Sequence, residues 1–389
     1  MRPRIVTLCA AALVLGITGT VPAHATTGST SGGSATSTTP VTRYAEIPLV
    51  SDISGKARLT DPKLVNPWGI SLGKALSVTN AGSGTVTLYT GGVDSIKKEQ
   101  VEIAVPGGRP TGQVVNPTHD FVVQGPAGKG PATHIFASAA GVISAFTPEA
   151  DPKNAIIAAF TRHADYKGLA LMETNRGNFL LAADFANNRI DVFDADFQKL
   201  KLGRRAFRDP LLPKNYHAYN VEVVGDVVMV AYALRDPRTG KSVAGRGKGF
   251  VSAFNASGRF LRRMVSRGQL NAPWAMILAP KRFGSFSNAL LIGNFGDGRI
   301  NAFHPRTGRH LGTLRHPNGR PIAIEGLWDL ERGSARLGGE DAVWYSAGIQ
   351  KAQHGLLGII RPARKGDPAG GSGTTSAGGG GSGSSGGGY

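Results

Sequence analysis

Apolar and polar residues alternate in short units that recur along the chain. Three twelve-residue segments, 78–89, 182–193 and 292–303, align without gaps. Each has a short stretch that ends in Asn or Asp, then small and polar residues, then an alternating apolar stretch that ends in an aromatic residue. Alternation indicates a half-buried strand, and Gly and Asn tolerate the positive φ angles of tight turns. Each unit therefore predicts a β-hairpin.

Three further hairpins of this pattern extend the series. They are predicted at 135–146, at 227–232 with 249–254, and at 342–347 with 355–360. The aromatic residues that close the first five hairpins, at positions 89, 146, 193, 254 and 303, lie 47 to 61 residues apart. A four-stranded propeller blade takes about 40 to 50 residues, so this spacing predicts a β-propeller with insertions.

A second recurring element precedes the hairpins. It has a polar residue, a bend and a short apolar stretch, and it occurs at 66–70, 167–171, 220–223, 271–277 and 325–330. We expect each copy to form the innermost strand of a blade.

The predicted fold class is all-β, a single β-propeller with six four-stranded blades. Too few residues follow the sixth hairpin to form its outer strand, and Tyr44 to Val50 can supply it. Closure by this N-terminal strand removes exposed sheet edges. Five or seven blades are the alternatives. A β-solenoid would need shorter repeats, and a two-domain sandwich would not repeat one hairpin at this spacing.

Both ends of the chain differ from the central body. Arg2 and Arg4, an apolar run from Ile5 to Val21 and an Ala-His-Ala triplet at 23–25 have the layout of a cleaved secretory signal. A transmembrane anchor is the alternative, but the run is short and contains glycines. We expect four parts: a signal peptide at 1–25, a flexible Ser/Thr/Gly-rich leader at 26–43, the β-propeller at 44–365, and a disordered Gly/Ser-rich tail at 366–389. The expected location is extracellular.

Composition narrows the possible chemistry and partners. The single cysteine, Cys9, lies in the predicted signal, so a disulfide, a zinc–thiolate site or a cysteine nucleophile is excluded from the mature chain. The net charge of +18 favours encounter with polyanions such as teichoic acids, acidic polysaccharides or anionic lipid. Nucleic acid is not expected as a partner, because only 7% of residues are aromatic and most are assigned to the core. We expect a monomer.

Several long motifs resemble a known family. They are Leu59 to Ile70, Leu270 to Trp274 and Ala289 to Phe303. With Leu49 to Asp52, they resemble a family of secreted bacterial proteins of unknown function, predicted to be six-bladed propellers of the NHL-repeat type. The resemblance covers about residues 44 to 360. It implies the fold and no reaction, substrate or catalytic residue.

Polar residues at the start of the predicted inner strands are the candidate ligand-binding residues, because these positions converge on the channel of a propeller. They are Asn66, Asn220, Asn271 and Glu325. The carboxylate of Glu325 with the amide oxygens of Asn220 and Asn271 would suit a Ca²⁺ ion. In composition only, this set resembles the metal centre of gluconolactonase-like propeller hydrolases. The alternative is that each Asn caps a turn through its own side chain.

Two other repeated features have a structural interpretation and a functional one. Asn80, Asp184 and Asn294 occupy one aligned position, so we expect a turn role repeated in each blade. Trp68 and Trp274, together with Trp328, share one register near the inner strands. They would either pack between blades or form an aromatic platform for sugar rings, and we favour packing.

No motif of a catalytic nucleophile, a zinc protease or a phosphate-binding loop with its helix is present. The loop from Ala233 to Lys248 is expected to be exposed and basic. With Arg262, Arg263 and Arg267 it would form a cationic patch. We therefore expect a non-enzymatic binding module that acts at the cell envelope or outside the cell. The alternative is a metal-dependent lactone or ester hydrolase.

Overall fold

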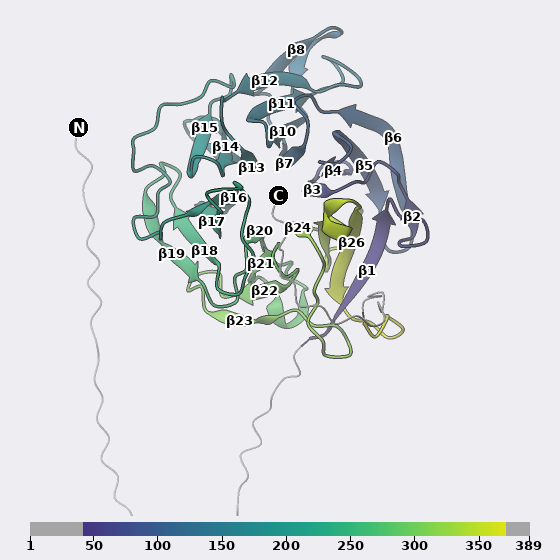
Figure 1. Cartoon of the computed structure of the whole chain (residues 1–389). Coiled ribbons are helices and arrows are strands. Elements are labelled where there is room, and N and C mark those ends of the chain that lie inside the picture. The colour runs from purple at the N-terminus through teal and green to yellow at the C-terminus, as the bar shows by residue number, and fades with distance from the viewer. Residues whose placement is uncertain (1–41, 371–389) are drawn as a thin grey trace, which may run out of the picture. The chain divides into compact units, whose positions relative to one another are not determined.

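The computed structural model describes residues 42–370, which form a ring of six β-sheets (Figure 1). The predicted signal peptide, most of the leader and most of the tail lie outside the described residues. Of the predicted tail, residues 366–370 are described, and they contact the propeller. Arg361 donates two hydrogen bonds of 2.8 Å to Asp367, and Asn318 N donates to Ala369 O.

The six blades follow one another along the chain, and the predicted all-β six-bladed propeller is confirmed. The strands of the first three blades are β3 (Pro67–Leu72), β4 (Leu76–Asn80), β5 (Thr85–Gly91) and β6 (Ile96–Ala104); β7 (Pro110–Val115), β10 (His134–Ser138), β11 (Val142–Phe146) and β12 (Ile156–Phe160); and β13 (Tyr166–Thr174), β14 (Gly177–Asp184) and β15 (Arg189–Phe193). The strands of the last three are β16 (Tyr216–Val224), β17 (Val227–Leu234), β18 (Gly249–Phe254) and β19 (Phe260–Ser266); β20 (Pro273–Leu278), β21 (Leu290–Asn294), β22 (Ile300–Phe303) and β23 (His310–Thr313); and β24 (Leu327–Arg332), β25 (Val343–Ala347), β26 (Leu356–Pro362) and β1 (Tyr44–Ser51).

The N-terminal strand closes the ring, as the sequence predicts. β1 pairs antiparallel with β26 of the last blade, from Tyr44 opposite Pro362 to Ser51 opposite Leu356. The short strand β2 (Leu59–Thr60) runs parallel to β1 on its other edge. Strands from the two ends of the described chain thus complete one sheet and close the ring.

The structure departs from the sequence prediction in two blades. The inner strand of the second blade, β7, was missed, although Pro110 and Gly112 repeat the Pro-x-Gly spacing of Pro67 and Gly69. A small hairpin, β8 (Val122–Gly125) with β9 (Gly128–Pro131), is inserted after it. The third blade has three strands instead of four, because the segment 199–215 contains two prolines and forms no outer strand in the described chain.

The inner strands pack side by side around the axis, in the order β3, β7, β13, β16, β20, β24 and back to β3. Glycines make this close packing possible. A Cβ on Gly112 of β7 would lie 2.5 Å from Leu169 N of β13. A Cβ on Gly168 of β13 would lie 1.7 Å from the Oδ1 atom of Asn220 on β16. At these positions neighbouring inner strands therefore approach more closely than a residue with a Cβ atom would allow.

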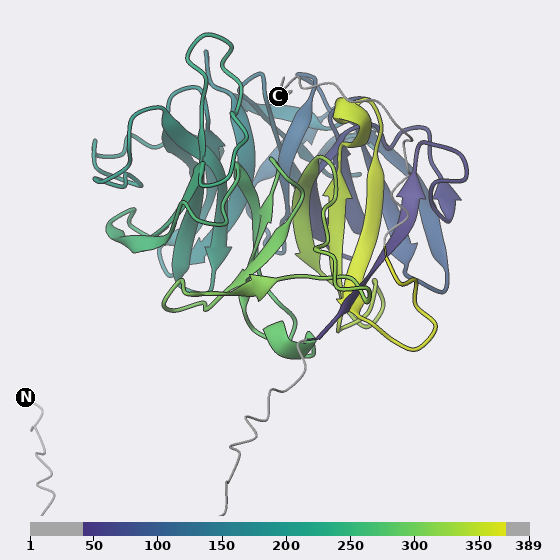
Figure 2. The same ribbon diagram turned by 60° about the horizontal axis from the view of Figure 1, so that its bottom comes forward.

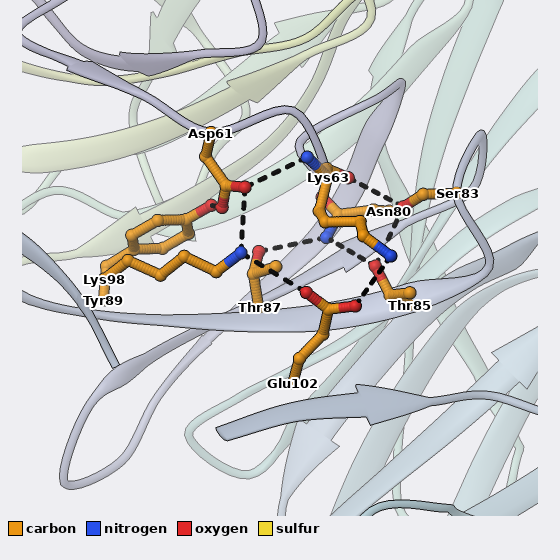
Figure 3. A network of polar contacts seen from close by, with 9 residues as sticks. All are labelled: Asp61, Lys63, Asn80, Ser83, Thr85, Thr87, Tyr89, Lys98 and Glu102. Carbon is orange, nitrogen blue, oxygen red and sulfur yellow. Dashed lines mark hydrogen bonds and ion pairs between the residues drawn. The ribbon is translucent and has the colours of Figure 1, made fainter. Parts of the chain in front are cut away.

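The predicted turn role of the aligned polar residues is confirmed. Asn80, which is fully buried, donates from Nδ2 to Thr87 Oγ1 at 3.0 Å. In the same blade Asp61 accepts hydrogen bonds from Tyr89 Oη at 2.6 Å and from Lys98 Nζ at 2.9 Å (Figure 3). Asp184 and Asn294 occupy the position of Asn80 in the third and fifth blades. Asp184 Oδ2 accepts from Asn187 Nδ2 at 2.7 Å, and Asn294 Oδ1 accepts from Asn271 N at 3.1 Å. These hydrogen bonds lie within single blades, although the Oδ1 atom of Asn80 has no partner in the described residues.

The two ends of the ring differ. Figure 2 shows the short 3-10 helix η1 (Gly284–Phe286) at one end, beside the start of β1, and the four-residue helix α1 (Ile349–Ala352) at the other. Thr42 N donates to Ser285 Oγ at 2.8 Å, which fixes η1 to the start of β1. No helix among residues 42–370 is long and apolar enough to cross a membrane.

Candidate functional site

The three candidate asparagines lie where the sequence places them, at or just before the inner strands, and all three are buried. Their amide oxygens contact different partners. Asn66 Oδ1 accepts from Trp328 Nε1 at 3.2 Å, and Asn271 Oδ1 accepts from Gly245 N at 2.6 Å. Asn220 Oδ1 accepts from its neighbour Val221 N at 2.8 Å, while its Nδ2 donates to Trp274 O in the next blade at 2.9 Å. These side chains join neighbouring blades.

Glu325 is placed differently from the asparagines. It is exposed, and its Oε1 atom accepts a hydrogen bond of 3.1 Å from Lys351 N of α1. Within residues 42–370, no group of three or more His, Cys, Asp or Glu side chains is arranged to hold a metal ion.

Aromatic side chains fill the axis of the ring. Trp68 of β3 stacks on Trp328 of β24, with centroids 3.5 Å apart, and meets Trp274 of β20 edge to face at 6.4 Å. Phe295 stacks on the other face of Trp328 at 4.1 Å. The first and fifth blades are not neighbours, so their tryptophans can meet only near the axis. The three indoles are at most 3% exposed, so the packing interpretation is confirmed.

A buried cation accompanies this aromatic cluster. Lys167 Nζ lies 5.1 Å from the centroid of the Trp68 ring and 3.0 Å from Asp165 Oδ1. Burial lowers the pKa of Lys167, and the neighbouring Asp165 carboxylate opposes that shift. The ammonium group is thus held by one carboxylate and one indole face.

The third blade carries a groove where its outer strand is missing. The segment 203–215 lies against β17 and the β18–β19 turn of the fourth blade and leaves a cavity of ≈ 940 Å³. Phe207 N donates to Gly258 O at 2.8 Å, and the Phe207 ring packs near Phe254, with centroids 5.8 Å apart. These contacts hold the segment on the fourth blade.

Five exposed basic side chains line this groove: Arg204, Arg205, Arg208, Lys214 and Arg259. Within residues 42–370, none of the five forms an ion pair with a carboxylate. The one acidic lining residue, Asp209, is buried and neutralised by Arg263, whose Nε donates to Asp209 Oδ2 at 2.8 Å. Ser252 Oγ donates to the same oxygen at 2.7 Å. The groove therefore presents uncompensated positive charge.

A buried polar atom lines the same groove. Tyr232 of β17 is 2% exposed, and its hydroxyl has no hydrogen-bond partner in the described chain. Burial raises the pKa of this hydroxyl far above its usual value, so the group is a neutral donor. An unsatisfied buried hydroxyl costs about 1–3 kcal/mol, which a bound acceptor would recover.

Sequence reasoning placed the cationic patch elsewhere. The predicted patch combines the loop from Ala233 to Lys248 with Arg262, Arg263 and Arg267. Of these, Arg263 is paired with Asp209, and the guanidinium groups of Arg263 and Arg267 lie over the Phe250 ring, at 4.7 and 5.4 Å. The groove was missed, although six basic residues occur between positions 199 and 214. This cluster of positive charge, in a segment without a predicted strand, is the sequence signal that points to the groove.

Comparisons with known proteins give relatives without an assigned activity. No family model matches the chain. An uncharacterised protein of Acanthamoeba polyphaga mimivirus is 34% identical over 324 residues, which cover 80% of this chain and 78% of that protein. A second uncharacterised protein of the same virus is 32% identical over 328 residues, which cover 80% of this chain and 84% of that protein.

Two solved structures are similar at low identity. A chain of a nidogen/laminin complex matches with a TM-score of 0.45 and 14% identity, over 72% of this chain and 96% of that one. Virginiamycin B lyase from Staphylococcus aureus matches with a TM-score of 0.44 and 12% identity, over 81% of this chain and 99% of that one. On its sequence relationships, this chain belongs to the same protein family as the two uncharacterised mimivirus proteins.

Proposed function

We propose that this protein is a secreted, non-enzymatic binding module whose groove beside the third blade holds an anionic polymer of a cell envelope. The observation that supports this most directly is the set of five unpaired basic side chains around one cavity of ≈ 940 Å³. Since like charges repel, such a set costs free energy in the free protein unless counter-ions or a ligand neutralise it. An anionic ligand would gain attraction from all five.

The geometry of the groove favours a polymer over a single small anion. The basic residues lie on two segments, four of them on 204–214 and Arg259 on the β18–β19 turn. A flexible chain with regularly spaced phosphate or carboxylate groups can contact both segments at once. Tyr232 Oη would supply a neutral hydrogen-bond donor to one anionic oxygen. The buried Asp209–Arg263 pair keeps the one lining carboxylate from repelling the ligand.

The experiment measures binding of two polymers to the purified protein. The probes are linear polyphosphate and polygalacturonate, which separate phosphate from carboxylate recognition, and neutral dextran is the control. We expect micromolar or tighter binding of one anionic probe that weakens as NaCl rises from about 50 to about 500 mM, because salt screens exposed charges. Equal affinity for dextran would contradict the proposal.

A variant tests whether the groove is the binding site. Arg204→Gln combined with Arg205→Gln and Arg208→Gln should weaken binding about tenfold or more, since each exposed pair contributes up to about 1 kcal/mol. The charge-matched control replaces three exposed basic residues of other blades by Gln: Lys97, Lys129 and Arg306. If both variants lose the same affinity, binding depends on the net charge of the protein and the groove has no special role.

A further inference from the structure

The axis of the ring holds a second cavity, near the ends of the inner strands. It has a volume of ≈ 440 Å³ and is lined by residues of all six inner strands, mostly from their C-terminal halves. Glu173, Gly225 and Arg332 are exposed at its rim, so it is open to solvent. Trp274 belongs to the tryptophan cluster and also lines this cavity, so the cluster and the cavity are adjacent.

Acidic side chains dominate the charge of this cavity, in contrast to the net charge of the chain. The titratable lining residues are Glu173, Glu222, Asp329, Glu331 and Arg332. Three of these carboxyls lie on two inner strands that are separated by β20: Glu222 on β16, and Asp329 and Glu331 on β24. Four acids thus face one exposed arginine. The lining contains no lysine or histidine.

The central carboxyls influence one another electrostatically. Burial raises the pKa of Glu222 well above its usual range, and the charges of Asp329 and Glu331 raise it further. Burial likewise raises the pKa of Glu331 to about 7. The charge of Arg332 opposes this shift at Glu331, whereas no basic residue opposes it at Glu222.

Two of the polar lining groups have no partner in the described chain. No residue donates a hydrogen bond to the Glu222 carboxyl, whereas Asp329 accepts from Ile70 N at 2.9 Å and from Leu330 N at 2.8 Å. Ser71 of β3 lines the cavity, is 7% exposed, and its Oγ atom has no hydrogen-bond partner. The buried Ser71 hydroxyl lacks a partner and lines the same cavity as a carboxyl that accepts no hydrogen bond from the described residues, which indicates a site completed by a ligand.

Apart from Gln113, whose amide donates to Gly69 O and Ser77 O, the remaining side chains of the lining are apolar and restrict the kind of ligand. Leu72, Leu171, Val224, Ile277 and Leu278 surround the acidic groups. The volume exceeds that of a single inorganic ion, and the carboxyls are not arranged as a metal site in the described residues. A ligand that fits has a positively charged, hydrogen-bond-donating head and a short apolar body.

We propose that this cavity binds a small organic cation with an ammonium or guanidinium head, which Glu222, Asp329 and Ser71 receive at the axis of the ring. The head donates hydrogen bonds to the free Glu222 carboxylate and to Ser71 Oγ, and the apolar body contacts the aliphatic lining. This site is independent of the cationic groove, which lies beside the third blade and attracts the opposite charge.

The test uses three probes that share one six-carbon chain: hexylammonium, 1-hexanol and hexanoate. Calorimetric titration of the purified protein at pH 8 should show hexylammonium binding at least tenfold more tightly than hexanol, and no binding of hexanoate. Because the bound cation favours the ionised carboxylates, the affinity should fall as the pH is lowered from about 8 to 5. Equal binding of hexylammonium and hexanol, or no binding of hexylammonium at millimolar concentration, would overturn the proposal.

Variants locate the site. Glu222→Gln should reduce hexylammonium affinity about tenfold while urea unfolding shows an equal or higher midpoint, since a repelled buried charge is removed. Ser71→Ala should reduce the affinity about threefold. The control Glu99→Gln changes an exposed residue of β6 and the net charge by the same amount. A loss of affinity in Glu99→Gln equal to that in Glu222→Gln would assign the effect to the general field of the protein and refute the site.

Discussion

The indole of Trp328 contacts two side chains from the start of the first blade: it stacks on Trp68 at 3.5 Å, and its Nε1 atom donates to Asn66 Oδ1 at 3.2 Å. Trp68 and Asn66 belong to the start of the first blade, and Trp328 belongs to the sixth. Residues about 260 positions apart in the sequence thus meet where the ring closes. This contact complements the closure at the outer edge, where β1 completes the sixth sheet.

Truncation of this contact should destabilise the ring. Trp328→Ala removes a fully buried side chain with aromatic neighbours on both faces, so we expect a loss of about 3–5 kcal/mol in the free energy of unfolding. Trp328→Phe keeps part of the stacking and loses the hydrogen bond to Asn66, so its loss should be smaller. Urea unfolding followed by circular dichroism measures both. An unchanged midpoint for Trp328→Ala would show that the axis contributes little to stability.

The unpartnered hydroxyl of the cationic groove gives a second prediction. Tyr232→Phe removes a buried group without a partner, so the unfolding midpoint should stay the same or rise, while affinity for the anionic polymer should fall about threefold. Tyr219→Phe is the matched control, because the Tyr219 hydroxyl lies 3.1 Å from Ser242 Oγ, outside the groove. That control should lose about 1 kcal/mol of stability and keep its affinity. Unchanged affinity in Tyr232→Phe together with reduced affinity in Tyr219→Phe would exclude Tyr232 from binding.

Glu46 predicts a pH dependence of stability. Burial raises the pKa of Glu46 from 4.5 to about 7, although Tyr345 Oη donates to its carboxyl at 3.3 Å. At a pH between these two pKa values, Glu46 keeps its proton in the folded state and has released it in the unfolded state. The contribution of Glu46 to stability is therefore fully present below about pH 4.5 and is lost as pH rises to about 7.

The measurement compares urea midpoints of the wild-type protein and Glu46→Gln across this range. The amide cannot ionise, so the variant should lose less stability than the wild type between about pH 5 and 8. Glu331, with a pKa also near 7, titrates in both proteins and cancels in the comparison. Parallel curves would mean that Glu46 keeps its usual pKa in the fold.

The N-terminal pattern predicts export with cleavage after Ala25. When the full chain is expressed in a bacterial host that exports proteins by signal peptides, the protein in the medium should begin at Thr26, as measured by N-terminal sequencing. Ala25→Leu should block cleavage, because the processing site requires a small residue at this position. Recovery of the uncut chain from the cytoplasm of the host would contradict the prediction.

The repeated pattern determined the six hairpins, the number of blades and the closing role of Tyr44 to Val50. These features depend on local chemistry: alternation decides which face of a strand is buried, and Gly, Asn and Asp decide where the chain turns. The turn roles of Asn80 and Asp184 followed from the same alignment. The inner strand β7 was missed, although Arg109 before Pro110 repeats the polar residue that precedes Pro67 in the first blade.

Only the tertiary structure decided what meets at the axis and what remains open at the surface. The amide oxygen of Asn66 accepts from an indole of the sixth blade, and Glu222 and Asp329 line one cavity at the axis, which no sequence spacing specifies. The cationic groove exists because the third blade lacks a strand. The sequence determined each blade through interactions between near neighbours. Closure of the ring brought distant residues together, because the geometry of the ring depends on the packing of all six blades at once.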